Sequence, residues 1–260
     1  MDRRLSMSEA WKELESEIGR WRDDGRPVEF WWRDDDAAQP NEAVERLFAL
    51  AGRSGVPLAL AVIPAQADPA LFAALPPQAD VLQHGTDHAN RAAPGEKKTE
   101  YPTGEAVESA LQRLVDGRRR LSRLAGARLL DVLAPPWNRI RPEIVAGLET
   151  CGIRGLSRYG ARNNASAVPG VFETNTHVDI IDWRGGRGFV GAEQALLQAV
   201  QHLAARREGR ADPAEPTGWL THHACHDERA WAFLDELFAR LGPGAGVRWV
   251  AARNLFVPRH

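Results

Sequence analysis

The chain has 260 residues, a formal net charge of −2 at pH 7 and 43% hydrophobic residues. This length suits one large α/β domain or two small ones, and the near-neutral charge gives no strong attraction for nucleic acid or acidic membranes. The N-terminus lacks the apolar segment of a signal peptide, and the apolar run LALAVI is too short to span a bilayer. With only Cys151 and Cys225, no disulfide framework supports the fold. We therefore expect a cytoplasmic protein with neither a nucleic-acid nor a membrane partner.

Residues 1–24 predict an amphipathic helix. Ser6 and Glu9 have the spacing of a capping box. An apolar stripe follows at helical period, formed by Trp11, Leu14, Ile18 and Trp21. The segment DDGRP at 23–27 ends the pattern. We expect this helix to pack on a single domain that spans residues 25–260.

Strand-like and helix-like segments alternate along the rest of the chain. Strands are expected over 27–33, 57–63, 80–83, 129–134, 153–157, 177–181, 217–222 and 247–252. Helices are expected over 41–53, 69–75, 104–124, 141–150, 191–207 and 227–241. Such alternation favours parallel strands joined by crossover helices, in an open doubly wound sheet or in a barrel.

Polar or aromatic segments stand just past five of the expected strands. They are DDD at 34–36, His84, APPW at 134–137, Asp182-Trp183 and His222. In parallel α/β folds the carboxyl ends of the strands form the rim where active sites are assembled. Because five strands contribute to one rim, we predict a distorted (β/α) barrel of about seven parallel strands.

The stretch HGTDHAN, residues 84–90, raises the question of a metal site. One helical turn would place the imidazoles of His84 and His88 on one face, near enough to hold one ion. A carboxylate of the Asp34-Asp35 pair could complete the ligand set, while its neighbour acts as a base toward a bound water molecule. The spacing alone also allows two histidines without a ligand role and a solvated DDD turn.

A rival metal site lies within HHACHD, residues 222–227. It would use His222, Cys225 and His226, with His223 as a further donor. The strand-to-helix transition expected there would aim these side chains in several directions. Metal content of substituted chains would separate the two sites.

Five motifs together resemble the polysaccharide deacetylase family, the NodB-homology domain of carbohydrate esterases, over residues 27–250. The segment RDDDA (33–37) resembles its aromatic-Asp-Asp-Gly motif, and HGTDH (84–88) resembles its His-x-x-x-His motif. The other three matches are APPWN (134–138) to Arg-Pro-Pro-Tyr-Gly, DIIDW (179–183) to Asp-x-x-Asp-Trp, and WLTHH (219–223) to Leu-x-His. The chain departs from these motifs at Asp36, Ala134, Trp137 and Asn138, where the family has Gly, Arg, Tyr and Gly.

The resemblance implies a metal-dependent hydrolase that removes an acetyl group from an N-acetylated sugar. By the motif match, Asp35, His84 and His88 would hold one divalent ion, with zinc expected. Asp34 would act as the base and His222 as the acid, with Asp182 supporting the imidazole. The residues expected at the substrate are Trp137, Asn138, Trp183 and Leu220.

Ala134 leaves the expected base without the family's arginine. Our hypothesis is that Arg139, Arg158 or Arg162 reaches Asp34 from another loop. The alternative is a degenerate domain that binds a glycan without hydrolysing it. Because no signal peptide is evident, the expected substrate is a soluble N-acetylated saccharide or a related small amide.

Overall fold

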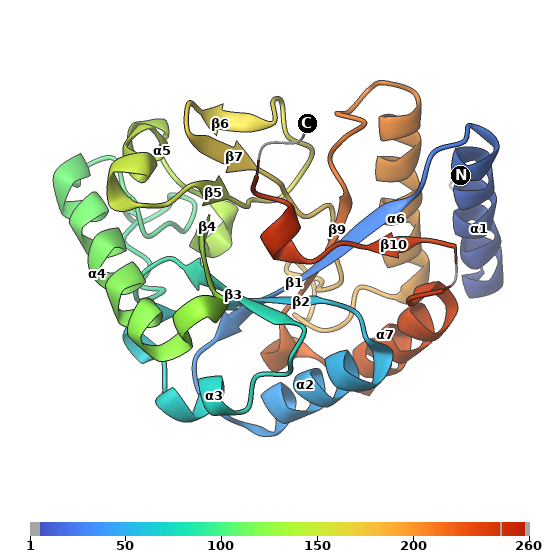
Figure 1. Cartoon of the computed structure of the whole chain (residues 1–260), viewed down its shortest axis with the longest axis horizontal. Coiled ribbons are helices and arrows are strands. Elements are labelled where there is room, and N and C mark those ends of the chain that lie inside the picture. The colour runs from blue at the N-terminus through green and yellow to red at the C-terminus, as the bar shows by residue number, and fades with distance from the viewer. Residues whose placement is uncertain (1–5, 245, 258–260) are drawn as a thin grey trace.

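The computed structural model describes residues 6–244 and 246–257. One sheet runs through it in the order β6-β7-β5-β4-β3-β2-β1-β9-β8, with β10 beside β1 (Figure 1). The strand bounds are β1 Glu29–Ala37, β2 Leu58–Val62, β3 Ala79–His84, β4 Leu129–Ala134, β5 Gly155–Leu156, β6 Ser166–Val168, β7 Val171–Glu173, β8 Val178–Asp179, β9 Thr217–Thr221 and β10 Arg248–Trp249.

The sheet is parallel except for the β6–β7 pair. A parallel bridge between Tyr159 and Thr176 brings the chain after β5 to the chain before β8, so the sheet curls toward closure. Because helices cover parallel strands on the outside, the central strands are buried on both faces, and the segment Phe30–Trp32 of β1 is almost wholly buried. The predicted α/β fold with a mostly parallel, distorted barrel is confirmed.

Seven α-helices in the described part of the chain surround the sheet (Figure 1). They are α1 Met7–Asp23, α2 Glu42–Ser54, α3 Pro69–Ala73, α4 Val107–Ala125, α5 Pro142–Gly147, α6 Ala192–Arg207 and α7 Glu228–Leu241. Among these seven, none combines the length and apolar character needed to cross a bilayer.

Helix α1 begins at the predicted capping box. The Glu9 N–H donates to the Ser6 hydroxyl, and the Ser6 N–H donates to the Glu9 carboxylate. The predicted stripe is buried at Trp11, Leu14 and Trp21 and packs the helix against α6. The division into residues 1–24 and 25–260 stays a prediction.

The β6–β7 hairpin is absent from the predicted elements, which placed a loop there. Each strand has only three residues, and Gly170 turns the chain between them with a φ of +80°. Three residues are too few to show the period-two alternation that marks a strand in a sequence. The hairpin extends the sheet at the β5 edge and leaves the rim with the candidate site unchanged.

Candidate active site

The three consecutive aspartates at the end of β1 meet three different sets of partners. The pairing of β1 with β2 is regular up to Asp34 and shifts between Asp34 and Ala37, and Asp36 has a φ of +70°. This irregularity is a β-bulge, which inserts a residue into a strand and re-aims the side chains beside it. The bulge therefore separates Asp34, Asp35 and Asp36, which a regular strand would place on alternating faces.

Asp36 is the carboxylate that meets the two histidines of HGTDH. Its Oδ1 lies 3.0 Å from Nε2 of His84 and 3.2 Å from Nε2 of His88, and this buried oxygen has no further hydrogen-bond partner. The Nδ1 of His84 lies 2.9 Å from the carbonyl oxygen of Ala134. Because a carbonyl only accepts, Nδ1 carries a proton, and a neutral His84 presents a lone pair at Nε2. The prediction placed Asp35 beside these histidines, and the bulge puts Asp36 there instead.

The HGTDH segment is not the helical turn suggested by its spacing. Gly85 and His88 both adopt left-handed backbone conformations, with φ of +57° and +59°. The fully buried carboxylate of Glu100 accepts the N–H groups of Thr86 and Asp87 at 3.0 Å each, and that of His88. Burial raises the pKa of Glu100, although these N–H groups oppose the rise. One carboxylate from the later part of the same loop thus fixes the backbone that carries His88.

Asp35 pairs with an arginine two residues earlier on the same strand. Nε of Arg33 lies 2.8 Å from Asp35 Oδ1, and Nη2 donates to Oδ2 at 3.0 Å. The fully buried guanidinium also donates to the Ser157 side chain at 2.7 Å and to Asn138 Oδ1 at 2.8 Å. The same Oδ2 lies 4.0 Å from Nε2 of His222. Asp35 therefore occupies the position predicted for Asp34, between an arginine and the candidate acid.

Asp34 is engaged beneath the rim. Its Oδ2 accepts the Thr221 hydroxyl at 2.6 Å and the His223 N–H at 3.1 Å, and Oδ1 lies 2.5 Å from His223 Nδ1. Burial raises the pKa of Asp34, but the His223 charge and these hydrogen bonds bring it below its usual value. Because Thr221 and His223 flank His222, Asp34 anchors the turn that carries the candidate acid.

The hypothesis of an arginine from another loop beside Asp34 is wrong. Each of the three candidates is engaged elsewhere: Arg139 donates to the carbonyl of Lys98, Arg158 pairs with Glu173, and Arg162 pairs with Asp212. The arginine that reaches the site is Arg33, and its partner is Asp35. Since residues i and i+2 of a strand share a face, the motif RDDDA itself contained this signal.

Trp183 and Asp179 lie beside His222. The Trp183 ring meets the imidazole edge-on at 4.7 Å between centroids, and its Nε1 donates to Asp179 Oδ2 at 2.7 Å. Burial raises the pKa of Asp179, and the charge of His222 opposes that rise. Asp182 instead accepts the N–H groups of Arg184 and Gly185 and shapes a turn. The carboxylate near the imidazole is thus Asp179 rather than the predicted Asp182, because Asp182 is committed to its own backbone.

The four residues predicted to contact a substrate lie beside His88, His222 and Arg33. The Trp137 ring lies 4.5 Å from that of His88, and Trp183, on the His222 side, is 44% exposed. Trp137 and Asn138 both have a φ of +55°, so the turn after β4 is tightly coiled. Leu220 is fully buried in β9, with Arg33 of β1 and Asp179 of β8 as its neighbours in register. Their roles toward a substrate stay predictions.

The rival site at residues 222–227 does not assemble. His223 is occupied by Asp34, and the His226 ring packs edge-on against Trp231 at 4.4 Å. Burial lowers the pKa of His226 to about 4. Within the residues the structure describes, no three donor atoms of this segment converge.

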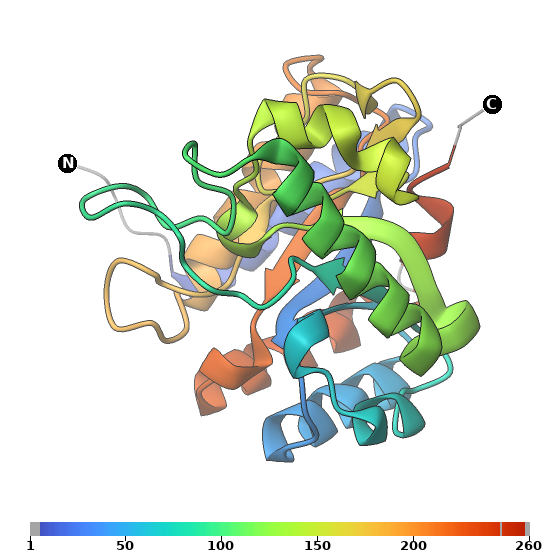
Figure 2. The same cartoon turned by 90° about the vertical axis from the view of Figure 1, so that its left-hand side faces the viewer.

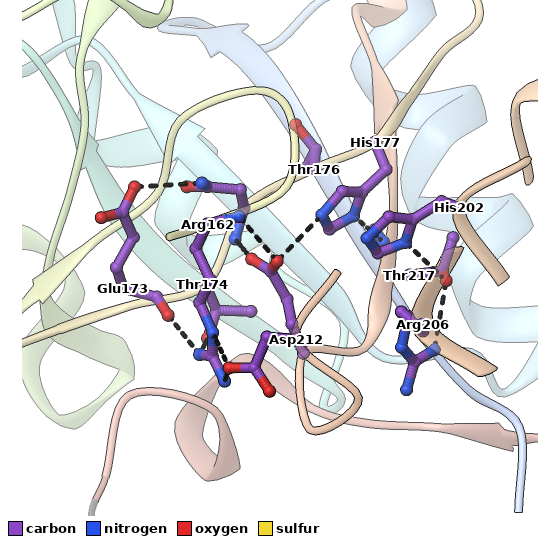
Figure 3. A network of polar contacts seen from close by, with 12 residues as sticks. Arg162, Glu173, Thr174, Thr176, His177, His202, Arg206, Asp212 and Thr217 are labelled. Carbon is purple, nitrogen blue, oxygen red and sulfur yellow. Dashed lines mark hydrogen bonds and ion pairs between the residues drawn. The ribbon is translucent and has the colours of Figure 1, made fainter. Parts of the chain in front are cut away.

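A second convergence of donors lies at the opposite end of β9, near its first residue, Thr217 (Figure 3). His177 and His202 stack at 3.4 Å with 12° between their planes, and His177 Nε2 lies 3.3 Å from Glu215. The Gly218 N–H donates to His177 Nδ1, so a neutral His177 carries its proton on Nε2 and has no lone pair there. Parallel stacked rings also aim their in-plane lone pairs side by side rather than at one point. This cluster therefore does not suit a metal ion.

The curled, mostly parallel sheet is similar to the fold of solved polysaccharide deacetylases and carbohydrate esterases. The resemblance in the motifs is therefore confirmed at the level of the fold. No family model matches the sequence, and the search of curated proteins gave no match.

The chain is similar in fold to several solved structures. A candidate polysaccharide deacetylase from Mycobacterium smegmatis is similar with a TM-score of 0.63 and 15% identity, over 91% of this chain and 94% of that one. A family 4 carbohydrate esterase from Streptomyces lividans, solved with acetate, gives 0.52 and 15% identity over 86% and 97% of the two chains. A family 4 acetyl xylan esterase from Clostridium thermocellum, solved with a cobalt ion, gives 0.50 and 12% identity over 88% and 90%.

Proposed function

We propose that the chain is a metal-dependent hydrolase that removes the acetyl group from an N-acetylated sugar or a related small amide. The observation that supports this most is the arrangement at one rim: Asp36, His84 and His88 converge beside an Arg33-held Asp35 and His222. The acetate and the cobalt ion in two structures of the same fold agree with this chemistry.

The residues proposed to hold the ion are Asp36, His84 and His88. A carboxylate oxygen and the Nε2 lone pair of a neutral His84 are both acceptors, so their approach to 3.0 Å requires either a proton on Nε2 or a metal ion that both atoms bind. One carboxylate and two imidazoles leave open positions on a catalytic zinc, which is the metal we propose. When bound, such an ion supplies a polarised acyl carbonyl and a more acidic water molecule.

Two groups of the chain are proposed to move protons. Asp35, held by Arg33, would take the proton of the water molecule that attacks the acyl carbon. His222 would deliver a proton to the departing amine. Asp179 would hold the Trp183 indole that lies against this imidazole. Oδ2 of Asp35 and Nε2 of His222 lie 4.0 Å apart, so the proposed base and acid are neighbours at one point of the rim. Trp137 and Trp183 would offer aromatic faces to sugar rings.

The test is acetate release from soluble N-acetyl sugars by zinc-loaded protein, with metal content measured in parallel. Asp36→Ala should lose the metal, whereas Asp35→Asn should keep it and lower kcat roughly 10²- to 10⁴-fold. If Asp34→Asn shows that loss while Asp35→Asn turns over normally, the assignment of the base is wrong. Binding of the sugars without any acetate release would favour the glycan-binding alternative.

A further inference from the structure

Five exposed cationic residues lie around the candidate site without a carboxylate partner. We call them the cationic rim: Lys97, Lys98, Arg139, Arg184 and Arg187. No ion pair is formed by any of them within the described part of the chain, and Arg139 is the only one whose side chain donates a hydrogen bond there, to the Lys98 carbonyl. Two of the three lysines in the whole sequence stand side by side in this rim.

Sixteen arginines of the described residues form an ion pair with a carboxylate, including exposed ones such as Arg53 with Asp235. In the cationic rim, five cations without such a pair gather in three short segments. The same segments carry two carboxylates: Glu96 accepts the Ala93 N–H, and Asp182 accepts two backbone N–H groups of its own turn. Five cations against two carboxylates leave these segments with a local excess of positive charge.

The cationic rim approaches the site from two sides. The loop before α4 carries the lysines, and Arg139 ties that loop to the turn whose Trp137 lies against His88. On the other side, Arg184 and Arg187 follow Trp183, which lies against His222. Figure 2 shows both loops, the green-teal one before α4 and the light orange one before α6, projecting from the same side of the molecule.

Arg187 is held in a conformation that favours glycine. Its φ is +57°, although Gly185, Gly186 and Gly188 stand beside it, and its N–H donates to the Asp182 carbonyl at 3.0 Å. Burial raises the pKa of the Cys225 thiol, and the Arg187 charge opposes that rise. A non-glycine residue in left-handed conformation is a feature that concentrates at ligand sites.

We infer that the substrate carries an acidic group, a phosphate or a carboxylate, which the cationic rim binds. This inference rests on the proposed function, and it narrows the N-acetylated substrate to an anionic one. Unpaired guanidinium and ammonium groups attract such anions at no cost of breaking an existing ion pair. Since the rim is exposed, its attraction is screened by salt.

The experiment compares N-acetylglucosamine with its 6-phosphate and with N-acetylmuramic acid, which carries a carboxylate. Binding is measured by calorimetry on zinc-loaded Asp35→Asn, so that no acetyl group is removed, and kcat/KM is measured on the unsubstituted chain. We expect about tenfold or greater preference for at least one anionic sugar, falling as ionic strength rises from about 0.02 M to 0.5 M. The two anionic sugars distinguish a phosphate from a carboxylate.

Charge reversal identifies the residues responsible. The double variants Lys97→Glu/Lys98→Glu and Arg184→Glu/Arg187→Glu should abolish most of the preference, while affinity for the neutral sugar stays within about twofold. The matched control is Lys12→Glu/Arg123→Glu, which changes the net charge equally on exposed positions of α1 and of the last turn of α4. The control should keep the preference.

Each outcome decides between the two proposals. Equal affinity for neutral and anionic sugars overturns the inference, as does a preference that survives in both rim variants, since the anion would then bind the metal ion directly. Selective, rim-dependent binding without any acetate release would support the cationic rim and contradict the deacetylase proposal. Hydrolysis of neutral and anionic sugars at equal kcat/KM would support the deacetylase proposal and contradict the role of the cationic rim.

Discussion

Arg33 is fully buried, and its guanidinium donates hydrogen bonds to Asp35, Asn138 and Ser157. Its planar fork suits this task, because it presents donors in fixed directions that a lysine ammonium cannot reproduce. The buried Asp35 depends on it, since a carboxylate left without its partner in a protein interior is strongly unfavourable.

We therefore predict different losses for two substitutions of Arg33. Arg33→Met should lower the free energy of unfolding by about 3–5 kcal/mol, as expected for one partner removed from a buried pair. Arg33→Lys should keep the charge and the fold but lower kcat at least tenfold, because one ammonium cannot hold Asp35 in place as a fork does. Urea unfolding and kcat on zinc-loaded protein measure both.

Arg53→Met is the matched control, because it breaks an ion pair with Asp235 in which both side chains are about half exposed. It should cost no more than about 1 kcal/mol. Equal losses for Arg33→Met and Arg53→Met would mean that burial of the Arg33–Asp35 pair adds nothing to its contribution.

The sequence identified the histidines of the site but misplaced the carboxylates. His84, His88 and His222 could be found because each follows a strand that reads clearly as buried. The shift from Asp35 to Asp36 could not be read, because a bulge is set by the pairing with β2 and by a positive φ at a residue that is not glycine. Asp179 stood in the motif DIIDW, yet only the structure shows that Asp182 is occupied by its own turn.

At the scale of elements, the later part of the loop between β3 and α4 holds the earlier part, which carries His88. Glu100 joins them through three N–H groups, and a side chain at Gly85 would overlap both Glu100 and Pro136. Nothing in the sequence marked Glu100, because its partners lie 12 to 14 residues earlier in an irregular segment. Loop-to-loop contacts of this kind have no period and no spacing rule, whereas the strands and long helices were predicted from theirs.

Glu100→Gln should weaken the proposed metal site although no proposed ligand is substituted. A glutamine amide offers one acceptor oxygen and an NH₂ group that faces N–H donors, so we expect a loss of about 1–3 kcal/mol in the free energy of unfolding. Zinc affinity should fall about 10- to 100-fold, as for other partners that orient metal ligands. Competition with a chelator measures the affinity.

Glu96→Gln in the same loop serves as the control, since Glu96 is exposed. It should change the free energy of unfolding by less than about 0.5 kcal/mol and leave zinc affinity intact. If both variants bind zinc as the unsubstituted chain does, Glu100 does not position His88.

At the scale of the whole molecule, titratable groups are concentrated at both ends of β9. One end carries His222 and the candidate site, and the other carries the stacked pair His177 and His202 beside Glu215 (Figure 3). Burial lowers the pKa of His202 to about 2, with the His177 and Arg206 charges adding to the effect. Burial also raises the pKa of Glu215 to about 7. These two shifts have opposite consequences for stability.

His202 should destabilise the fold as pH falls. Below its unfolded pKa of about 6.5 the unfolded chain binds a proton that the folded chain does not, so stability decreases by about 1.4 kcal/mol per pH unit until the folded pKa is reached. Glu215 acts the other way between about pH 7 and 4.5, because there the folded state binds the extra proton. A comparison with a His202 variant is needed to separate the two.

We predict that the difference in free energy of unfolding between the unsubstituted chain and His202→Gln narrows as pH falls from 6 to 4. Its slope should be about 1.4 kcal/mol per unit, because the variant no longer titrates at this position. Urea unfolding at four or five pH values is sufficient. If the free energies of unfolding of the two chains change in parallel with pH, His202 binds its proton equally in the folded and unfolded states.

The placement of Arg33 and Asp35 on one strand has an evolutionary consequence. The proposed base and the arginine that holds it are inherited together as two letters of one short segment, rather than as residues of two loops that must change in step. The turn after β4 contacts this pair only through Asn138, whose Oδ1 accepts a hydrogen bond from Arg33. We therefore expect substitutions of Trp137 or Arg139 to change contacts to a substrate while the proposed base keeps its arginine.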